Sequence, residues 1–238
     1  MPKDVLNGIV LRVTDYRESD RILNILTRER GLVAVVARGC RKANSKYAAY
    51  SSQFTFGEIE VSEMAGKLRL ASANAVESFY PIRESYEQLL SATHVVYAAE
   101  HISRGDVPND ELFVLLYNAL SLIAYGDNDP KDIELAFMAK MIKLCGYAPT
   151  LTSCVKCGRD LRACRQIRFS NSLGGSVCER CGSAFAAYST LALEALRRMM
   201  ILDTSDMRRV RLPDGVREEL YALIYNYAEY IFEFTLKR

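Results

Sequence analysis

Apolar positions recur at short intervals through residues 5–77, in runs that glycines and polar turns interrupt. Ile9, Leu11 and Val13 stand at alternate positions, as in a strand with one buried face. Gly31 separates two further apolar runs, and Ala65-Gly66 marks a later turn. The expected strands lie near residues 9–13, 22–27, 32–37, 54–61 and 67–75. Five short strands in about 75 residues fit a small barrel or sandwich, and an OB-fold is one such barrel.

The apolar pattern changes to a helical period after Tyr80-Pro81. Residues at three- and four-residue spacings share one face of a helix, so the next stripe predicts an amphipathic helix. Its members are Tyr86, Leu89, Leu90, Thr93, Val96 and Tyr97. Asparagine, serine, threonine and Asp-Pro are typical of helix starts, and they mark the later helices. These begin near Asn109, Asp129-Pro130, Ser189 or Thr190, and Val216.

Four cysteines interrupt the helical region in the pattern C-x₂-C-x₂₀-C-x₂-C. They are Cys154, Cys157, Cys178 and Cys181. Two residues between paired cysteines let both thiolates reach one ion from a tight turn, and two such turns complete the tetrahedral shell of a structural Zn²⁺ site. A glycine follows each second cysteine, and we expect both glycines to adopt a left-handed backbone. The pattern predicts one structural zinc ion per chain, without the open position that catalysis needs.

Disulfides are the alternative for these four cysteines. The chain has seven cysteines, an odd number, and its start at Met1-Pro2-Lys3-Asp4 lacks the apolar core of a secretory signal. It also has no run of about 18 apolar residues, which a membrane-spanning helix needs. We therefore expect a cytoplasmic protein, a reducing compartment and no membrane contact.

Charge is unevenly distributed, although the formal net charge is only +2. Residues 1–80 carry 12 basic and 9 acidic side chains, residues 81–150 carry 5 and 10, and residues 151–185 carry 6 and 2. Two basic regions therefore flank an acidic middle, which is typical of chains that bind nucleic acid through part of their surface. Four thiolates with one Zn²⁺ carry a charge of −2, so zinc would lower the charge of the cysteine region to about +2.

The second informative segment follows the third expected strand. No acidic residue occurs from Arg30 to Gly57. The basic and aromatic side chains that we expect to contact nucleic acid are Arg38, Arg41, Lys42, Lys46 and Tyr47. Cations neutralise phosphates, and exposed rings stack on unpaired bases. A solvated loop with some core aromatics is the other interpretation, but such loops usually mix in acidic residues.

The sequence gives no positive sign of an enzyme. It contains no phosphate-binding glycine loop and no nucleophile elbow. His94 and His101 are the only histidines, and ordinary polar helix positions explain them. Cys40, Cys145 and Cys164 are spare thiols, of which Cys164 lies between the two cysteine pairs and could compete for metal. We expect no catalytic residues and no small-molecule substrate.

No predicted helix is long enough to be stable alone, so we expect all of them to pack into one bundle. The predicted fold is α+β: an N-terminal five-stranded OB-fold barrel, then a helical bundle with an inserted four-cysteine zinc module. The predicted divisions are 1–80 for the nucleic-acid-binding barrel, 81–149 for the helical domain, 150–185 for the zinc module and 186–238 for the closing helices of the helical domain.

Several stretches resemble the RecO family of recombination mediators. They are GIVLR at 8–12, YRESDRI at 16–22, TRERG at 27–31, VARGCRK at 36–42, GYAPTL at 146–151 and CVKCG at 154–158. The order of parts also matches, and the resemblance covers essentially the whole chain. The Tyr-x-Glu-Ser-Asp and Ala-Arg-Gly stretches are fairly specific in combination, whereas many zinc modules share the cysteine spacing.

This resemblance implies a bacterial protein that binds single- and double-stranded DNA, anneals complementary strands and is associated with the nucleoid. It implies RecR and the C-terminal tail of the single-strand binding protein SSB as partners, and a role in loading RecA during DNA repair. On the family pattern the barrel contacts DNA, which falls on Arg38, Arg41 and Lys42 here. The metal site is not universal in the family, so the full cysteine set favours a structural zinc in this member.

Two alternatives come from other classes of protein. OB-folds and four-cysteine modules also bind RNA, so a zinc-ribbon RNA-binding or translation-associated factor is the main rival. A metal-dependent nuclease or hydrolase would need carboxylates around an open metal position, and the sequence shows no such cluster.

Overall fold

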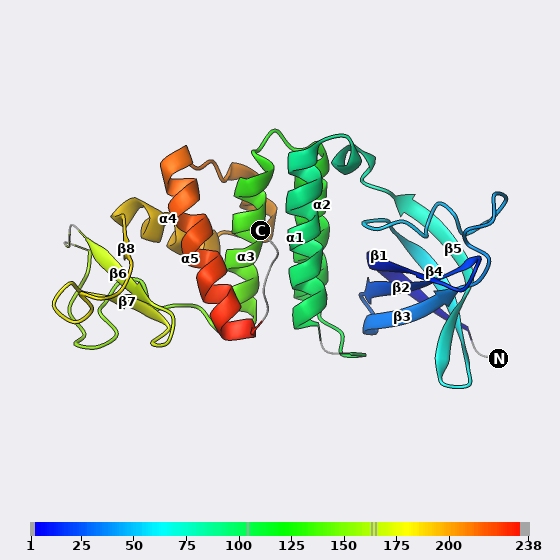
Figure 1. The fold of residues 1–238 in the computed structure, drawn as a ribbon, viewed down its shortest axis with the longest axis horizontal. Helices are drawn as coiled ribbons and strands as arrows, with labels where there is room; N and C mark the ends of the chain where they lie inside the picture. The colour runs from blue at the N-terminus through cyan, green and yellow to red at the C-terminus, as the bar shows by residue number, and fades with distance from the viewer. Residues whose placement is uncertain (1–2, 104, 163, 165, 234–238) are drawn as a thin grey trace. The chain divides into compact units, whose positions relative to one another are not determined.

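A computed structural model describes residues 3–103, 105–162, 164 and 166–233 (Figure 1). The chain forms two compact units that divide between Tyr125 and Gly126. The first holds a barrel and two helices, and the second holds the remaining helices and a small sheet. Among the described residues, no helix combines the length and the apolarity needed to span a membrane.

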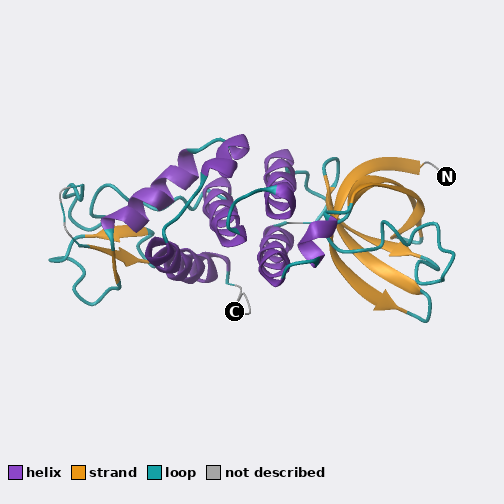
Figure 2. Ribbon diagram, turned by 90° about the horizontal axis from the view of Figure 1, so that it is seen from above, coloured by secondary structure: helices purple, strands orange, loops and turns teal. Residues whose placement is uncertain are grey.

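Five strands close into a barrel in the order β1-β2-β3-β5-β4, drawn blue to cyan in Figure 1 and curling round in Figure 2. Their bounds are β1 Lys3–Tyr16, β2 Asp20–Thr27, β3 Gly31–Ala37, β4 Phe56–Met64 and β5 Lys67–Glu77. All neighbours are antiparallel except β3 and β5, which run parallel and pair only at Val35–Leu68 and Val36–Arg69. The barrel with the helices after it confirms the predicted fold class.

Alternation along the strands builds the barrel core. In β3 the burial pattern alternates, so Val33, Val35 and Ala37 face inward. Tyr50, from the long β3–β4 connection, is buried in the barrel core. Its hydroxyl donates a hydrogen bond to the Gly8 carbonyl at 3.0 Å. The other buried members are Leu6, Val10, Leu23, Ile25, Cys40, Ile59, Val61 and Leu70.

A short 3₁₀ helix, η1 Tyr80–Arg83, leads to α1 Tyr86–Ile102 and α2 Asp110–Tyr125. Ser85 caps α1, and Asn109 caps α2 by accepting the Leu112 amide at 2.9 Å, as the sequence predicted for Asn109. An aromatic cluster joins α2 to the barrel. Phe56 lies edge-on to Tyr117 with ring centroids 5.1 Å apart, and Phe113 and Phe79 extend the cluster.

The buried face of α1 differs from the predicted one. Tyr86, Leu89, Leu90, Thr93 and Tyr97 are exposed in the structure. The face that packs is made mostly of small residues, namely Ser91, Ala92, His94, Val95, Val96, Ala98 and Ala99. Small side chains let helices approach closely. The buried face of α1 is therefore the one that packs best, not the one with the most hydrophobic residues.

The second unit contains α3 Pro130–Leu144, α4 Thr190–Ile201, η2 Thr204–Arg209 and α5 Asp214–Phe232. Every residue of α3 from Asp132 to Ile142 is buried. The Asp132 carboxylate is only 1% exposed and accepts hydrogen bonds from Arg217 Nε at 2.7 Å and from the Leu212 amide at 3.0 Å. Lys140 donates to the Leu202 carbonyl and Lys143 to the Met200 carbonyl, so two α3 lysines satisfy acceptors around the end of α4.

Between α3 and α4 the chain forms a three-stranded sheet in the order β7-β6-β8. The strands are short: β6 Ile167–Ser170, β7 Gly175–Val177 and β8 Ala187–Tyr188. Phe169 packs edge-on against Tyr227 of α5 at 5.3 Å, and the Asn171 side chain donates to the Asn226 carbonyl. The inserted segment therefore rests on α5.

The boundary between the two units falls between α2 and α3, inside the segment 81–149. A single bundle of all helices was expected from the sequence. By their contacts, α1 and α2 cluster with the barrel, and α3, α4 and α5 cluster with the inserted sheet, so the single bundle stays a prediction. The four predicted divisions, 1–80, 81–149, 150–185 and 186–238, stay a prediction.

Candidate metal centre and nucleic-acid interface

The first cysteine pair lies in a tight turn before β6. The Cys154 amide donates to the Arg159 carbonyl at 2.8 Å, and the Gly158 amide donates to the Cys154 carbonyl at 2.8 Å. Gly158 has φ +73°, a left-handed conformation that L side chains rarely adopt, as the sequence predicted. We call residues 154–159 the first knuckle.

The second pair follows β7 directly. The amides of Cys181 and Gly182 both donate to the Cys178 carbonyl, at 3.0 and 3.1 Å. We call residues 178–182 the second knuckle. Gly182 is not left-handed, so that prediction was wrong for this glycine. A Cβ there would lie 2.7 Å from both Phe185 and Val177, so lack of space is what requires glycine.

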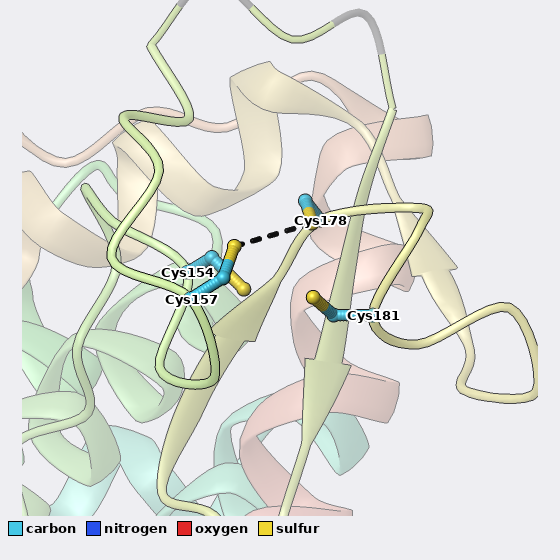
Figure 3. Close-up of side chains that lie close together, drawn as sticks. All are labelled: Cys154, Cys157, Cys178 and Cys181. Atoms are coloured by element: carbon cyan, nitrogen blue, oxygen red, sulfur yellow. Dashed lines mark hydrogen bonds between the residues drawn. The ribbon is translucent and has the colours of Figure 1, made fainter.

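The two knuckles bring all four sulfur atoms together (Figure 3). The four Sγ atoms lie within 4.8 Å of one another, and those of Cys157 and Cys178 are 3.8 Å apart. Four sulfurs at about 2.3 Å from a central ion stand about 3.8 Å from each other, so this donor set fits a tetrahedral metal site. Cys154 and Cys178 are buried and Cys157 is exposed, and no position in the four-sulfur shell is left for substrate.

The thiols differ in their readiness to ionise. Burial raises the pKa of Cys154, but backbone amides of Cys178, Cys157 and Lys156 outweigh it and lower this pKa to about 6. Hydrogen bonds with the sulfurs of Cys178 and Cys157 raise the pKa of Cys181 to about 12. The Cys154 thiol therefore ionises easily. A bound cation would have to displace the protons of the other cysteines.

Cys164 lies outside the four-sulfur group, although the sequence suggested that it could compete for metal. Its Sγ faces the Asp160 carbonyl at 3.9 Å. Cys40 belongs to the barrel core, and Cys145 follows α3 as its C-cap. Among the described residues, these four cysteines form the one group of three or more His, Cys, Asp or Glu side chains placed to hold a metal ion.

A groove of about 490 Å³ runs over the outer surface of the barrel. It lies where β2, β3 and the β4–β5 hairpin meet, and Tyr16 at the end of β1 and Arg17 in the β1–β2 turn also line it. Its charged lining residues are Arg17, Arg30, Arg38, Lys67 and Arg69, with Asp20, Glu63 and Asp106.

Several of these charges are already engaged. Arg30 pairs with Asp4 at 3.2 Å and with Asp106 at 3.1 Å, and the Asp20 carboxylate accepts the Gly39 amide at 2.8 Å. Within the described chain, neither Arg38 nor Lys67 has an acidic partner. The groove therefore keeps a positive surplus.

The predicted nucleic-acid residues fall in and beside this groove. Arg38 lines it. Arg41, Lys42 and Lys46 are exposed on the following loop, where Arg41 lies 3.5 Å from Asp15. Tyr47 packs against the barrel core, donates its hydroxyl to the Ala71 carbonyl at 2.8 Å and carries the Lys46 ammonium over its ring at 4.9 Å. One face of its ring is therefore covered.

The sequence did not indicate four of the groove residues. Tyr16 ends β1, Arg17 in the following turn lies above its ring at 5.2 Å, and Lys67 and Arg69 come from the start of β5. These residues are far apart along the chain and mixed with acidic neighbours, so no local run marks them. The signal that could have found them is the general position of the binding loops and strand faces in an OB-fold.

A second groove, of about 310 Å³, lies beside α4 in the second unit. Its lining is mostly apolar: Leu191, Ala195, Met199, Leu202, Val210, Leu212, Pro213 and Val216. Its charged lining residues are Arg198, Arg209 and Arg211, with Glu194. Each of these arginines pairs with an acidic side chain, at 3.0, 3.1 and 2.7 Å respectively.

Comparison with known proteins agrees with this arrangement of barrel, helices and cysteine module. The model "Recombination protein O N terminal" matches residues 2–79, and "Recombination protein O C terminal" matches residues 83–238. Proteins named DNA repair protein RecO are similar throughout. The one from Desulforamulus reducens is 30% identical over 98% of this chain and 91% of its own. The one from Bacillus pumilus is 32% identical over 92% and 86%.

The relative from Rubrobacter xylanophilus, also named DNA repair protein RecO, is 35% identical over 74% of this chain and 70% of its own length. Both family models together cover the barrel and the helical part with its cysteine knuckles. The resemblance first visible in the Tyr-x-Glu-Ser-Asp and Ala-Arg-Gly stretches is thus confirmed over the whole chain, which belongs to the RecO family.

Proposed function

We propose that this protein is a DNA-binding recombination mediator in DNA repair. It anneals single strands and, with RecR, helps replace SSB by RecA. The basic groove on the barrel is the observation that carries the proposal, because its cations match a phosphate backbone and its Tyr16 ring matches a base. Membership of the RecO family, whose curated relatives are named DNA repair proteins, supports the same role.

Single-stranded DNA enters the barrel groove in this proposal. Arg17, Arg38 and Lys67 contact successive phosphates, and Tyr16 stacks on an unpaired base. Contacts of this kind read charge and base faces rather than sequence, which suits a protein that must act on any gap. The exposed Arg41, Lys42 and Lys46 extend the contact along the loop, whereas Tyr47 serves the core more than the DNA.

The metal in this proposal is one structural Zn²⁺ per chain. Four sulfurs in tetrahedral reach are the donor set that zinc takes in closed sites. Zinc would fix the two knuckles and the sheet between them, and it would perform no chemistry on DNA. The protein accordingly works without catalytic residues.

The groove beside α4 is the place where we expect the SSB C-terminal tail. An acidic peptide with apolar side chains matches an apolar lining edged by arginines. The three arginines pair with surface carboxylates, and such pairs are worth little in water, so a ligand's carboxylates can replace them.

The decisive experiment is annealing of complementary single strands coated with SSB, followed by fluorescence quenching, with and without this protein. We expect faster annealing without ATP and a loss of the effect when the SSB tail is deleted. Annealing no faster than with SSB alone would refute the mediator role.

The contribution of the basic segment is tested separately. Replacing Arg38, Arg41 and Lys42 together by alanine removes three phosphate contacts, so the log–log salt slope of single-strand binding should fall by about 2. Circular dichroism checks that the barrel stays folded. An unchanged slope would place the DNA contact elsewhere.

The rival function, RNA binding, uses the same fold parts. The cations of the groove match phosphates of either nucleic acid, so we expect no preference for RNA. Competition between structured RNA and single-stranded DNA of equal length measures this preference. A clear preference for structured RNA would favour the translation-associated alternative.

A further inference from the structure

The outer surface of the two cysteine knuckles is basic. Lys156 and Arg159 flank Cys157 on the first knuckle, and Arg180 lies between the two cysteines of the second. All three side chains are exposed. We call Lys156, Arg159 and Arg180 the knuckle face.

Lys156 joins the two halves of this face. Its ammonium donates to the Cys181 carbonyl at 3.1 Å and lies 5.5 Å from the centre of the Phe185 ring. A cation of the first knuckle therefore sits on the second knuckle. The four sulfurs lie within 4.8 Å of one another. The two knuckles, which carry the three cations, are therefore adjacent.

Acidic side chains only partly neutralise the knuckle face, to which the exposed Glu179 beside Arg180 contributes one negative charge. Asp160 and Glu179 are the only acids in residues 150–185. Arg162 holds Asp160 with hydrogen bonds of 2.6 to 3.0 Å and lowers its pKa to about 2, so this carboxylate is already paired. In the part of the chain that the structure describes, Arg159 and Arg180 have no acidic partner.

The negative charge of the sulfurs does not cancel the face either. Cys154 and Cys178 are only 2% and 3% exposed, so half of the thiolate shell lies inside the knuckles while the guanidinium groups project into solvent. A ligand that approaches from outside meets these cations together with the exposed Cys157. Its interaction with them is then screened over about 8–10 Å by salt, which favours direct contact.

We propose that the knuckle face is a second DNA-contact site, which holds the phosphates of one strand while the barrel groove holds another. The inference rests on the proposed function only in taking the barrel groove as the first DNA site. The two sites belong to separate units of the chain. One molecule would therefore carry both strands of a pair that is to be annealed.

A phosphate backbone fits this face better than a protein partner does. Stable protein interfaces need buried aromatic or aliphatic anchors. The knuckle face offers only Phe185, whose ring the Lys156 side chain partly covers. Phosphate contacts require cations alone, and they are independent of sequence.

The test compares Arg159→Ala/Arg180→Ala with a control of equal charge, Lys131→Ala/Arg208→Ala. Lys131 lies in the first turn of α3 and Arg208 lies in η2, both outside the knuckles. Two non-complementary oligothymidines, one with a donor and one with an acceptor dye, report by energy transfer when one assembly holds both. We expect the knuckle variant to lose at least tenfold in bridging and the control to keep it, with both variants retaining one zinc per chain.

Binding of a single oligothymidine provides the second readout. Each lost phosphate contact lowers the log–log salt slope on single strands by about 0.7. The knuckle variant should therefore lose about 1.4 in the slope of the knuckle site and nothing in the slope of the barrel groove. Bridging and slopes equal to those of the control would overturn the inference, even if the intact protein binds DNA. Absence of any DNA binding by the intact protein would instead refute the proposed function.

Discussion

Each cysteine of the cluster has a different relation to solvent. Cys154 and Cys178 are buried, Cys181 is half-buried and Cys157 is exposed. The segment between the pairs buries few apolar groups, chiefly Leu161, Ile167, Phe169 and Val177. Such a small core cannot fix the segment without a further constraint.

Replacing Cys178 by serine should therefore abolish zinc binding at stoichiometric metal. A serine oxygen is a poor substitute in a four-thiolate shell, and its side chain would stay buried without a partner. Cys164→Ser is the matched control and should keep one zinc per chain, because Cys164 lies outside the group. Metal analysis of freshly reduced protein measures both. Full zinc content in Cys178→Ser would show that another ligand takes part.

Glu194 gives a pH-dependent contribution to stability. Arg197, and then Arg198, lowers the pKa of its carboxyl from 4.5 to about 2. The folded state binds the proton less well than the unfolded state, so the contribution is present above pH 4.5 and disappears as the pH falls through 2. The side chain is 41% exposed, so solvent screening limits the effect to about 0.5 kcal/mol.

Urea unfolding of Glu194→Gln and of the unaltered protein at pH 5.5, 3.5 and 2.5 checks this. The difference in unfolding free energy should shrink towards the lowest pH. A difference that stays constant with pH would mean that the ion pairs with Arg197 and Arg198 contribute nothing.

The four cysteines and Arg38 could be recognised from the sequence because each sits in a short local pattern. The rest of the barrel groove could not. Tyr16 and Lys67 are single residues outside any basic run, and folding of the barrel brings them to one surface. The same holds for Lys156, whose ammonium reaches the other knuckle through the folded turn.

Among the elements, α3 is the helix with the most buried polar groups. Asp132 is paired with Arg217, while Glu134 accepts a hydrogen bond from Tyr225 and Lys140 bonds a carbonyl at the end of α4. Desolvation by burial lowers the pKa of Lys140. Buried polar groups are costly unless every one has a partner, so α3 tolerates little change in its neighbours.

Arg217→Met should lower the unfolding free energy of the second unit by about 3–5 kcal/mol. The change leaves the Asp132 carboxylate buried with one amide donor from Leu212. Arg208→Met is the control, since Arg208 is exposed, and should change the free energy by about 0.5 kcal/mol or less. Urea unfolding monitored by circular dichroism measures both. Equal values for the two variants would show that the buried pair with Asp132 is not needed.

The groove beside α4 can be tested by one charge in its lining. Ala195 lies in the middle of α4, where glutamate keeps a high helix propensity. Ala195→Glu should weaken an SSB tail peptide at least tenfold, because a carboxylate then faces the acidic ligand. Fluorescence polarisation with a labelled tail peptide measures the affinity, and Ala195→Gln controls for size. Equal binding by both variants would move the tail site elsewhere.

Helix starts and strands followed the sequence pattern closely, and the packing partners of the helices did not. Asn109 and Ser189 accept the amides expected of capping residues, because capping depends on neighbouring residues alone. The face of α1 was wrong because Tyr86 and Tyr97 raised the hydrophobicity of a stripe that solvent contacts. Aromatic rings at Phe56 and Tyr117, far apart in sequence, are what tie α2 to the barrel.

At the scale of the whole molecule, the chain separates a barrel with two helices from a second unit that carries the cysteine module. Each unit has its own buried core: the barrel core in the first, and the α3, α4 and α5 contacts in the second. Loss of structure in one unit should therefore spread only partly to the other.

Zinc removal from the full chain tests this separation. Zinc binding in comparable small modules supplies about 10–16 kcal/mol, much of it as folding energy. With a strong chelator and reductant, amide exchange should accelerate in residues 150–188 and more weakly in α5, on which the module rests. Exchange in β1 to β5 should not change. Equal acceleration in the barrel would show that the two units unfold together.

The pairing of β3 with β5 is the shortest connection in the barrel wall, with two residue pairs against seven or more at every other junction. With so few residue pairs to hold it, this junction should open before the others. Arg38 and Arg69 stand on its two sides in the basic groove. A strand of DNA lying across that groove would hold the β3–β5 junction closed. The mechanical strength of the barrel should therefore rise as DNA occupies the groove.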